Sequence, residues 1–501
     1  MLIHLSCSHL FASVHSSGFY SFLSRSRPIS CYRSLTVCRN ASSVFHGQPA
    51  RSSEPTVCEN DSTASLITHS PPTSAYLHLP FCRRRCYYCD FPVIALGTSG
   101  PSPDDDPRIS NYAQLLCNEI ESTPPYMEPL PLQTVFFGGG TPSLTPPRTL
   151  RTIIQTLSSK FGLVPDVEMS MEIDPGTFDA NSLRQFIQLG VNRLSLGVQA
   201  FQDEALRLCG RSHGLKEVYE AIDIIRASNV ENWSLDLISS LPHQTAEDWK
   251  KNLEQAIQAQ PSHISVYDLQ IEEGTKFGNV YQAGEFPLPS EYKSAEFYRM
   301  AHEMLTGSGY VHYEISNYCK EGFECKHNLT YWTNQPYYGF GLGSTSYVGG
   351  VRFTRPRRMR KYAEFVEGLA DGESENGLVL EHKDDDAPRK ERAMDIVMLS
   401  LRLARGLDID CFAREFGWSL VLEICRAFQP YVESGHVTPL DEERRVVNVE
   451  EFLQFCSTEN GWDSHFQSRK CGLIKFIRLS DPDGFLLSNE IISTAFKVIS
   501  P

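Results

Sequence analysis

From residue 75 onward, short apolar runs rich in branched and aromatic residues alternate with segments in which apolar residues recur every three or four positions. The short runs predict strands at 75–79, 134–137, 166–173, 193–197, 232–237 and 263–267. The periodic segments predict helices at 112–122, 148–160, 180–189, 215–228, 246–258 and 291–306. Strands that alternate with helices predict an α/β fold with a parallel sheet, either doubly wound or curled toward a barrel.

The pattern changes after this region. A polar and aromatic stretch covers 312–346, and charged residues then dominate 372–392, which is typical of a linker. The elements expected beyond it are two amphipathic helices and two short strands, at 393–403, 420–432, 436–439 and 445–449. Helices followed by a small hairpin favour a C-terminal helical, winged-helix-like domain.

The amino-terminal segment has a different composition. No Asp or Glu precedes Glu54, serine is abundant, and arginine is the only basic residue in the first fifty-odd positions apart from histidine. This bias is typical of an organellar transit peptide, and a disordered tail is the alternative. We therefore expect residues 1–70 to be a transit peptide and disordered leader, and the protein to lie in the mitochondrial matrix or the chloroplast stroma after its removal.

Composition excludes several classes of protein. The 501 residues are 41% hydrophobic and 21% charged, which is typical of folded globular chains. A net charge of −15 opposes wholesale binding to nucleic acid. Because no run of about 18 apolar residues occurs, a transmembrane segment is not expected. The fifteen cysteines are spread along the chain except for one cluster, a pattern unlike a disulfide framework.

That cluster is Cys82-x-x-x-Cys86-x-x-Cys89, directly after the first expected strand. Three thiolates on one loop can hold three irons of a [4Fe–4S] cluster and leave the fourth iron open to another ligand. Zinc is the alternative, but a structural zinc site uses four protein ligands and the nearby sequence offers only His78 as the fourth. The spacing therefore favours an iron–sulfur cluster.

The segment from Tyr76 to Phe91, which contains Tyr-Leu-His-Leu-Pro-Phe-Cys and ends in Cys-Asp-Phe, resembles the opening motif of the radical S-adenosylmethionine (SAM) superfamily. Within it, the segment resembles the oxygen-independent coproporphyrinogen III oxidase-like group and its HemW branch of haem chaperones, and the resemblance extends over about 75–496. It implies a partial (β/α)6 barrel whose three loop cysteines hold a [4Fe–4S] cluster. The open iron of that cluster would bind SAM, and an electron from a reductase or ferredoxin-type donor would cleave SAM to a 5′-deoxyadenosyl radical.

The same resemblance implies residues that contact SAM. Gly139, Gly140 and Thr141 belong to a Gly-Gly-Gly-Thr-Pro loop that resembles the loop receiving the methionine amino group, although alone it could be an ordinary turn. The other implied contacts are polar or aromatic side chains near strand ends, namely Tyr76, Tyr88, Glu172, Gln199, Arg211 and Asp236. Carboxylates can accept hydrogen bonds from an amino group or ribose hydroxyls, and an arginine fork suits the cofactor carboxylate. A purely structural role is the alternative for each.

Three consecutive arginines, 83–85, lie inside the cysteine loop. The simpler interpretation is a solvated charge run. The alternative is a docking patch for an acidic electron donor or for porphyrin propionates, because guanidinium groups pair well with carboxylates.

A second distinctive string runs from Cys325 through His327 to Tyr331 and Trp332. On its chemistry alone, His327 could be a loop histidine packed among aromatic rings. The string resembles the HNxxYW signature of the HemW branch, however, and this resemblance implies that His327 takes part in haem binding.

These resemblances together imply an organellar haem chaperone that binds a [4Fe–4S] cluster, SAM and haem and delivers haem to an acceptor protein. The alternative is an oxygen-independent coproporphyrinogen III oxidase or dehydrogenase of porphyrin biosynthesis. Those enzymes carry a fourth cysteine two residues after the third, where this chain has Phe91, and this difference opposes the alternative. We therefore expect SAM cleavage without assigning a catalytic residue. A zinc-stabilised interaction module is the third interpretation.

The expected organisation has four parts. They are a leader (1–70), a radical SAM barrel (71–290), a segment that completes the barrel and contains the HNxxYW region (291–385), and a C-terminal winged-helix-like domain (386–501). The last part contains an unusual insertion near 447–477, which we interpret as a surface loop or a gene-model artefact.

Overall fold

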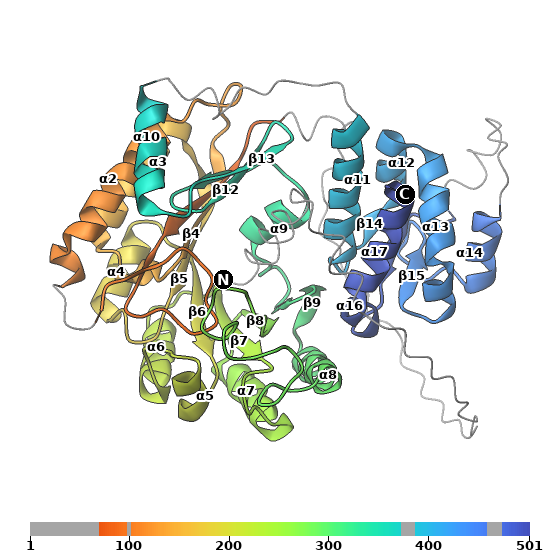
Figure 1. Cartoon of the computed structure of the whole chain (residues 1–501), viewed down its shortest axis with the longest axis horizontal. Coiled ribbons are helices and arrows are strands. Elements are labelled where there is room, and N and C mark those ends of the chain that lie inside the picture. Colours follow the sequence, from red (N-terminus) through yellow and green to blue (C-terminus); the bar gives the residue numbers. More distant parts are fainter. Residues whose placement is uncertain (1–69, 98–101, 372–385, 458–472, 501) are drawn as a thin grey trace. The chain divides into compact units, whose positions relative to one another are not determined.

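The computed structural model describes residues 70–97, 102–371, 386–457 and 473–500 (Figure 1). These residues belong to one compact unit. None of the helices in these ranges has the length and apolar character needed to cross a bilayer. The expected transit peptide lies outside the described residues except for Ser70, so the targeting role and the four-part division stay predictions.

The main sheet of the described chain has nine strands in the order β11-β1-β4-β5-β6-β7-β8-β10-β9. Their bounds are Tyr338–Phe340 (β11), Ser74–Leu79 (β1), Leu132–Gly139 (β4), Leu163–Ile173 (β5), Arg193–Gln199 (β6), Trp233–Ser239 (β7), His263–Asp268 (β8), Asn317–Cys319 (β10) and Val311–Glu314 (β9). Neighbours from β11 to β8 are parallel, and β10 and β9 are antiparallel. The predicted parallel α/β sheet is confirmed. All six expected strands are present. The strand order of the described chain is that of an open sheet and not of a closed barrel.

Helices follow the strands as expected. Their bounds are Pro107–Ser122 (α2), Pro147–Phe161 (α3), Ala180–Gln188 (α4), Leu215–Ala227 (α6), Ala246–Ala259 (α7) and Glu291–Gly307 (α8), and a short helix, α5, spans Asp203–Leu208. Among these helices the largest difference is at α2, which begins five residues before the expected position. The reason is local, because the Asp106 carboxylate accepts the backbone N–H of Arg108 at 2.9 Å and caps the helix.

The stretch 312–346 contains short elements that hydrophobic periodicity did not predict. Besides strands of the main sheet, this region and the residues after it contain α9 (Lys326–Trp332), β12 (Thr345–Val348), β13 (Val351–Thr354) and α10 (Met359–Ala370). Helix α9 packs against the sheet side of β4 that carries Thr134 and Phe136, and Figure 1 shows it beside the sheet. Because side chains alternate along a strand, Val135 and Phe137 face the opposite side of the sheet.

The C-terminal part contains a second, smaller sheet. Its elements are α11 (Asp386–Leu401), β14 (Leu407–Asp408), α12 (Ile409–Phe416), α13 (Trp418–Glu433), β15 (Val437–Leu440), α14 (Val449–Cys456), β16 (Phe476–Leu479), α16 (Asp483–Leu486) and α17 (Ser488–Ile499). The strands are antiparallel in the order β14-β16-β15. A helix, a strand, two helices and a pair of strands agree with the expected winged-helix-like arrangement, except that α14 lies between the two strands of the pair, β15 and β16.

The expected strand at 445–449 is wrong. Residues 442–443 form a turn, residues 445–448 meet β15 only through a single bridge at Val446, and α14 begins at Val449. Asn448 and Glu451 cap this helix reciprocally. The Asn-x-x-Glu spacing in the sequence therefore indicates the start of a helix here and not a strand. Strand β15 pairs with β16 instead. Part of the suspected insertion therefore forms α14, and Trp462 and Cys471 lie outside the described residues.

A buried carboxyl group lies at the edge of the main sheet. Glu314 ends β9 and is fully buried, and its carboxyl accepts hydrogen bonds from the Asn317 amide and the Ser316 N–H. Burial raises the pKa of Glu314 to about 8, because it penalises the charged form more than these two donors favour it. The exposed Glu of an unfolded chain has a pKa of about 4.3.

This difference predicts a pH-dependent loss of stability. The folded state holds the Glu314 proton more tightly than the unfolded state, so its favourable effect is complete below about pH 4 and is lost as pH rises toward 8. Glu314→Gln keeps the neutral form at every pH. The parent chain should lose unfolding free energy as pH rises, and Glu314→Gln should lose a few kcal/mol less over the same range. The measurement is the unfolding free energy of both proteins at pH 5.5, 7 and 8.5. Identical pH profiles for Glu314→Gln, the parent and the surface control Glu254→Gln would contradict the assignment.

Candidate functional site

The three clustered cysteines lie on the loop that leaves β1. Within it, β2 (Phe81–Cys82) pairs in parallel with β3 (Ile94–Ala95), and the Cys89 N–H donates to the Cys86 carbonyl at 3.2 Å. The thiols are free, and burial raises the pKa of Cys89 to about 12 and that of Cys82 further. The Cys82 and Cys89 thiols are therefore neutral without a metal, and metal binding would release their protons.

The arginine run holds this loop in place. The Arg84 Nε donates to the Gly210 carbonyl at 3.0 Å, and Arg85 donates from Nε to the Cys89 carbonyl at 2.9 Å and from Nη2 to the Phe91 carbonyl at 3.1 Å. Both side chains are exposed, yet their guanidinium groups bind backbone oxygens. A freely solvated run does not describe these two residues, because their donors fix the path of the cysteine loop, and the docking patch stays a prediction.

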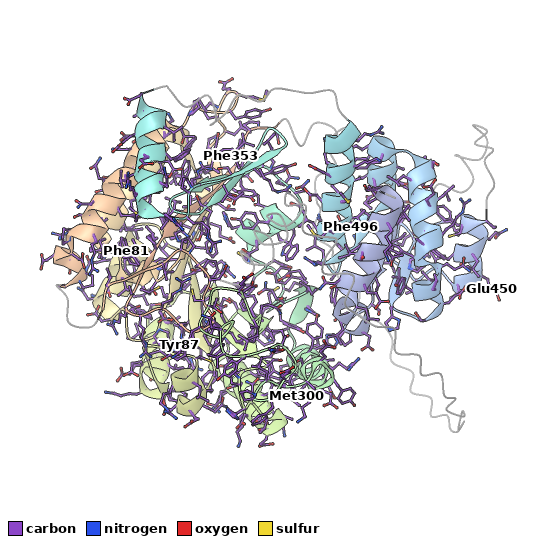
Figure 2. The ribbon with its side chains drawn as sticks, in the orientation of Figure 1. Phe81, Tyr87, Met300, Phe353, Glu450 and Phe496 are labelled. Atoms are coloured by element: carbon purple, nitrogen blue, oxygen red, sulfur yellow. The ribbon has the colours of Figure 1, made fainter. Side chains whose placement is uncertain are left out.

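Sequence reasoning missed the aromatic contact on the loop's outer side. Tyr87, labelled in Figure 2, accepts the Phe277 N–H at its carbonyl at 2.9 Å, and the Lys276 ammonium lies 3.4 Å above its ring. Gly210 has φ +72°, and a Cβ there would lie 2.7 Å from the Tyr87 ring. A glycine is thus required where the ring approaches the backbone.

The glycine loop at the end of β4, residues 138–142, lines the cavity together with the cysteine loop. Gly139 has φ +115°, and a Cβ there would lie 2.6 Å from the His78 ring. A Cβ at Gly140 would lie 2.7 Å from the Pro80 backbone. Both glycines therefore allow the backbone of this loop to pass close to the end of β1, which an ordinary turn does not need.

Neighbouring polar groups fix this loop. The Thr141 N–H donates to the Phe81 carbonyl at 2.7 Å, and the Thr141 hydroxyl lies 3.6 Å from Cys82 Sγ. The Gly139 N–H donates to Glu172 Oε2 at 3.0 Å. Burial raises the pKa of Glu172 above its usual value. The structure thus connects the glycine loop to one cysteine and one buried carboxyl group.

Arg211 joins the cysteine loop to the end of β5. Its guanidinium pairs with Asp174 and donates to Cys86 Sγ and to the Tyr88 hydroxyl, both at 3.3 Å. Burial acts to raise the pKa of Asp174, but Arg211 and His213 outweigh it and hold this pKa below its usual value. Asp174 was not predicted as a site residue, although its place directly after a parallel strand was the available signal.

One cavity gathers most of the predicted residues. Its lining includes the three cysteines, Gly139, Gly140, Thr141 and Arg211, together with Arg83, Arg84, Arg85, Val93, Asp174 and Ser212. Glu172 reaches this group through its bond to Gly139, and Tyr88 through Arg211. Tyr76, Gln199 and Asp236 are not among the residues that line this cavity.

These three residues lie near the cavity without lining it, and a Cβ at Gly197 would lie 3.1 Å from Gln199 Nε2 and 3.5 Å from Arg211 Nη2. Tyr76 is buried, donates to or accepts from His78 Nδ1 at 3.1 Å, and packs with Phe136. Gln199 ends β6 with φ +71°. Asp236 lies in the middle of β7 and not at its end, because the strand continues to Ser239, and it accepts hydrogen bonds from two serine hydroxyls.

His327 is buried in the first turn of α9. Its Nδ1 lies 2.7 Å from the Thr134 hydroxyl and its Nε2 lies 2.7 Å from the Tyr331 hydroxyl. Its backbone N–H donates to Glu168, and its ring stacks on Phe136 at 5.2 Å. Both ring nitrogens are therefore engaged, and ligation of haem iron requires one of these bonds to break. The role of His327 stays a prediction.

The residues that line the cavity have the chemistry needed by the two groups that the motif implies. It presents three thiol ligands on one loop and a glycine cradle that side chains would fill. Arg211 Nε is buried and has no hydrogen-bond partner among the described residues, so one charged donor remains for a carboxylate ligand. A three-thiolate site beside an anion-binding group suits an iron–sulfur cluster and an amino-acid cofactor.

Comparison with known proteins agrees with this geometry. The Radical SAM superfamily profile matches residues 76–256. A protein of Synechocystis named "Heme chaperone HemW" is 40% identical over 438 residues, which cover 86% of this chain and 98% of that protein. The Escherichia coli protein of the same name is 36% identical over 60% of this chain and 76% of its own length.

Two further matches are more distant. A Danio rerio protein named "Radical S-adenosyl methionine domain-containing protein 1, mitochondrial" is 31% identical over 56% of this chain and 61% of its own length. Among solved structures, Escherichia coli coproporphyrinogen III oxidase (HemN), described as a radical SAM enzyme, matches with a TM-score of 0.66. That match covers 86% of this chain and 92% of the enzyme at 20% identity, which shows a shared fold alone.

Proposed function

Because the chain belongs to the HemW family within the radical SAM superfamily, we propose that it is a haem chaperone, which binds haem and delivers it to an acceptor protein. The observation that carries the proposal is the 40% identity to a haem chaperone over 98% of that protein's length. Similarity over so much of the chain includes both the cysteine region and the HNxxYW region.

The residues on the cysteine loop would hold a [4Fe–4S] cluster, and the glycine loop and Arg211 would hold SAM. When bound, this pair supplies one-electron reductive cleavage of SAM. The chain's own residues prepare the site. Arg85 fixes the loop by binding the Cys89 carbonyl, Arg211 offers a free Nε to a carboxylate, and Phe277 covers Tyr88 at 6.3 Å between ring centroids.

Phe91 opposes the alternative of coproporphyrinogen oxidation. The residue at this position is buried, and its carbonyl accepts a hydrogen bond from Arg85. It presents a hydrocarbon side chain where the decarboxylating enzymes carry a sulfur ligand or reactant. The fold shared with HemN does not restore the missing thiol, because function depends on the site and not on the fold.

One anaerobic experiment separates the two functions. The reconstituted chain is incubated with coproporphyrinogen III, SAM and a reductant, and haem is titrated into a parallel sample. We expect stoichiometric haem uptake and no decarboxylated porphyrin by mass spectrometry. Protoporphyrinogen formed over many turnovers would establish the oxidase instead, and absence of haem uptake would refute the chaperone.

Paired variants test His327 as a haem ligand. His327→Ala should weaken haem binding and shift the Soret band. Tyr331→Phe removes the hydroxyl that lies 2.7 Å from His327 Nε2, so it should keep the parent spectrum and bind haem at least as tightly. Affinity and Soret spectra are measured for both variants. If His327→Ala leaves both readouts unchanged, His327 is not a ligand.

We also propose an organellar location and two protein partners, a reductase or ferredoxin-type donor and a haem acceptor. The acid-free, serine-rich leader supports import. The higher identity to a cyanobacterial relative, 40% against 31% for the zebrafish mitochondrial one, favours the chloroplast over the mitochondrion. Residues 1–70 fused to a fluorescent protein should enter plastids, and a cytosolic signal would refute import.

A further inference from the structure

Two histidines and an aspartate meet away from the cysteine site. His302 lies on α8, which Met300 marks in Figure 2, His312 lies on β9, and Asp481 follows β16. Asp481 Oδ1 lies 2.8 Å from His312 Nδ1 and 3.1 Å from His302 Nδ1. All three ligand atoms lie within 4.8 Å of one another. Two imidazole nitrogens therefore face one carboxylate oxygen.

The hydrogen bonds of this cluster leave one nitrogen unsatisfied. His312 Nδ1 donates a hydrogen bond to Asp481 Oδ1, so both of these atoms have a partner. His302 Nδ1 is also buried, but among the described residues it makes no hydrogen bond, although it is close to the same oxygen. A cation bound between the three atoms would satisfy this nitrogen and the carboxylate together.

The surrounding residues hold the ligands in position. The His312 ring stacks on Tyr318 with 4.0 Å between ring centroids and an angle of 7°, and it meets the edge of Phe485 at 5.2 Å. His302 and Asp481 retain 23% and 24% of their side-chain exposure, so water can reach the open side of the cluster. One rigid ligand and two ligands open to solvent suit a cation that keeps a water molecule.

We propose that His302, His312 and Asp481 form a divalent-cation site, occupied by Zn²⁺ with water as the fourth ligand. Two imidazoles and one carboxylate are ligands that zinc accepts, whereas Ca²⁺ and Mg²⁺ prefer oxygen alone. The ion connects α8 and β9 to the loop before α16. His312 Nε2 is buried without a partner in the described chain, so the site lacks the second-shell acceptor that would strengthen zinc binding further.

The test uses the full chain with its iron–sulfur cluster reconstituted anaerobically, so that the three loop cysteines are occupied. Zn²⁺ is added and bound zinc is counted after dialysis. X-ray absorption at the zinc edge then identifies the ligands. We expect one zinc per chain with imidazole and oxygen ligands and no sulfur. Thermal unfolding should occur at a higher temperature when Zn²⁺ is present.

Variants decide which residues bind the ion. His302→Ala and Asp481→Asn should each weaken zinc binding at least about 100-fold and leave the cluster absorbance unchanged. Both side chains are partly exposed, so these variants should fold even if His312→Ala does not. The control His243→Ala removes an exposed histidine and should bind zinc as the parent does. Sulfur ligands at the zinc edge, or unchanged affinity in His302→Ala, would overturn the proposal.

Discussion

Cys86→Ala is expected to abolish both the iron–sulfur cluster and the cleavage of SAM. The loop supplies only three thiols to the cavity, so the variant leaves two, too few to hold the cluster. Cys86 is also the thiol that Arg211 contacts, at 3.3 Å, so the substitution removes one partner of the residue expected to bind the cofactor carboxylate. After anaerobic reconstitution the variant should be colourless, contain little iron and form no 5′-deoxyadenosine.

The matched control is Cys117→Ala. Cys117 is buried on α2 and does not line the cavity, so the variant should be brown and should cleave SAM as the parent does. Visible absorption, iron content and mass spectrometry of 5′-deoxyadenosine give three independent readouts. A brown Cys86→Ala protein that cleaves SAM would contradict the ligand assignment. If zinc replaced iron in the parent, the parent would be colourless as well.

The strands and helices of the parallel sheet were predictable because each carries its own signal along the chain. Strand β4 contains the continuous apolar run Val135–Phe137, and α3 repeats apolar residues on one face. Strands β11 and β10 have three residues each, too few to show a period, and they exist because the long sheet beside them offers hydrogen-bonding partners. The strand expected at 445–449 shows the opposite case. Its apolar residues suggested a strand, but the capping residues Asn448 and Glu451 start a helix at Val449.

The candidate site was predictable only as far as its motifs are local. The cysteines and the glycine loop are contiguous strings, whose spacing and chemistry are legible in the sequence. Asp174 and Arg211 are 37 residues apart, and nothing in either segment shows that they pair. His327 shows the same limit, because both of its ring nitrogens are engaged, one by Thr134 on β4 at 2.7 Å. Such partners depend on the fold, and they decide whether a residue is free to bind a ligand.

A buried ion pair holds the region that periodicity failed to predict. Glu119 on α2 accepts the Arg355 Nε–H at 2.7 Å, and both side chains are at most 2% exposed. The second Glu119 oxygen accepts the Tyr362 hydroxyl at 2.7 Å and the Gly341 N–H at 2.8 Å. Gly341 in turn approaches the end of β1, since a Cβ there would lie 2.8 Å from the His78 carbonyl. The pair therefore supports the strand from which the cysteine loop leaves.

Glu119→Ala is accordingly expected to destabilise the chain by about 3–5 kcal/mol, because it leaves the Arg355 charge buried without its counter-charge. The double variant Glu119→Leu with Arg355→Met should be less destabilised, since it removes both charges. Glu364→Ala breaks an exposed pair with Arg360 and should leave stability nearly unchanged. Urea unfolding measures all three. A Glu119→Ala variant as stable as Glu364→Ala would show that the buried pair does not hold this region.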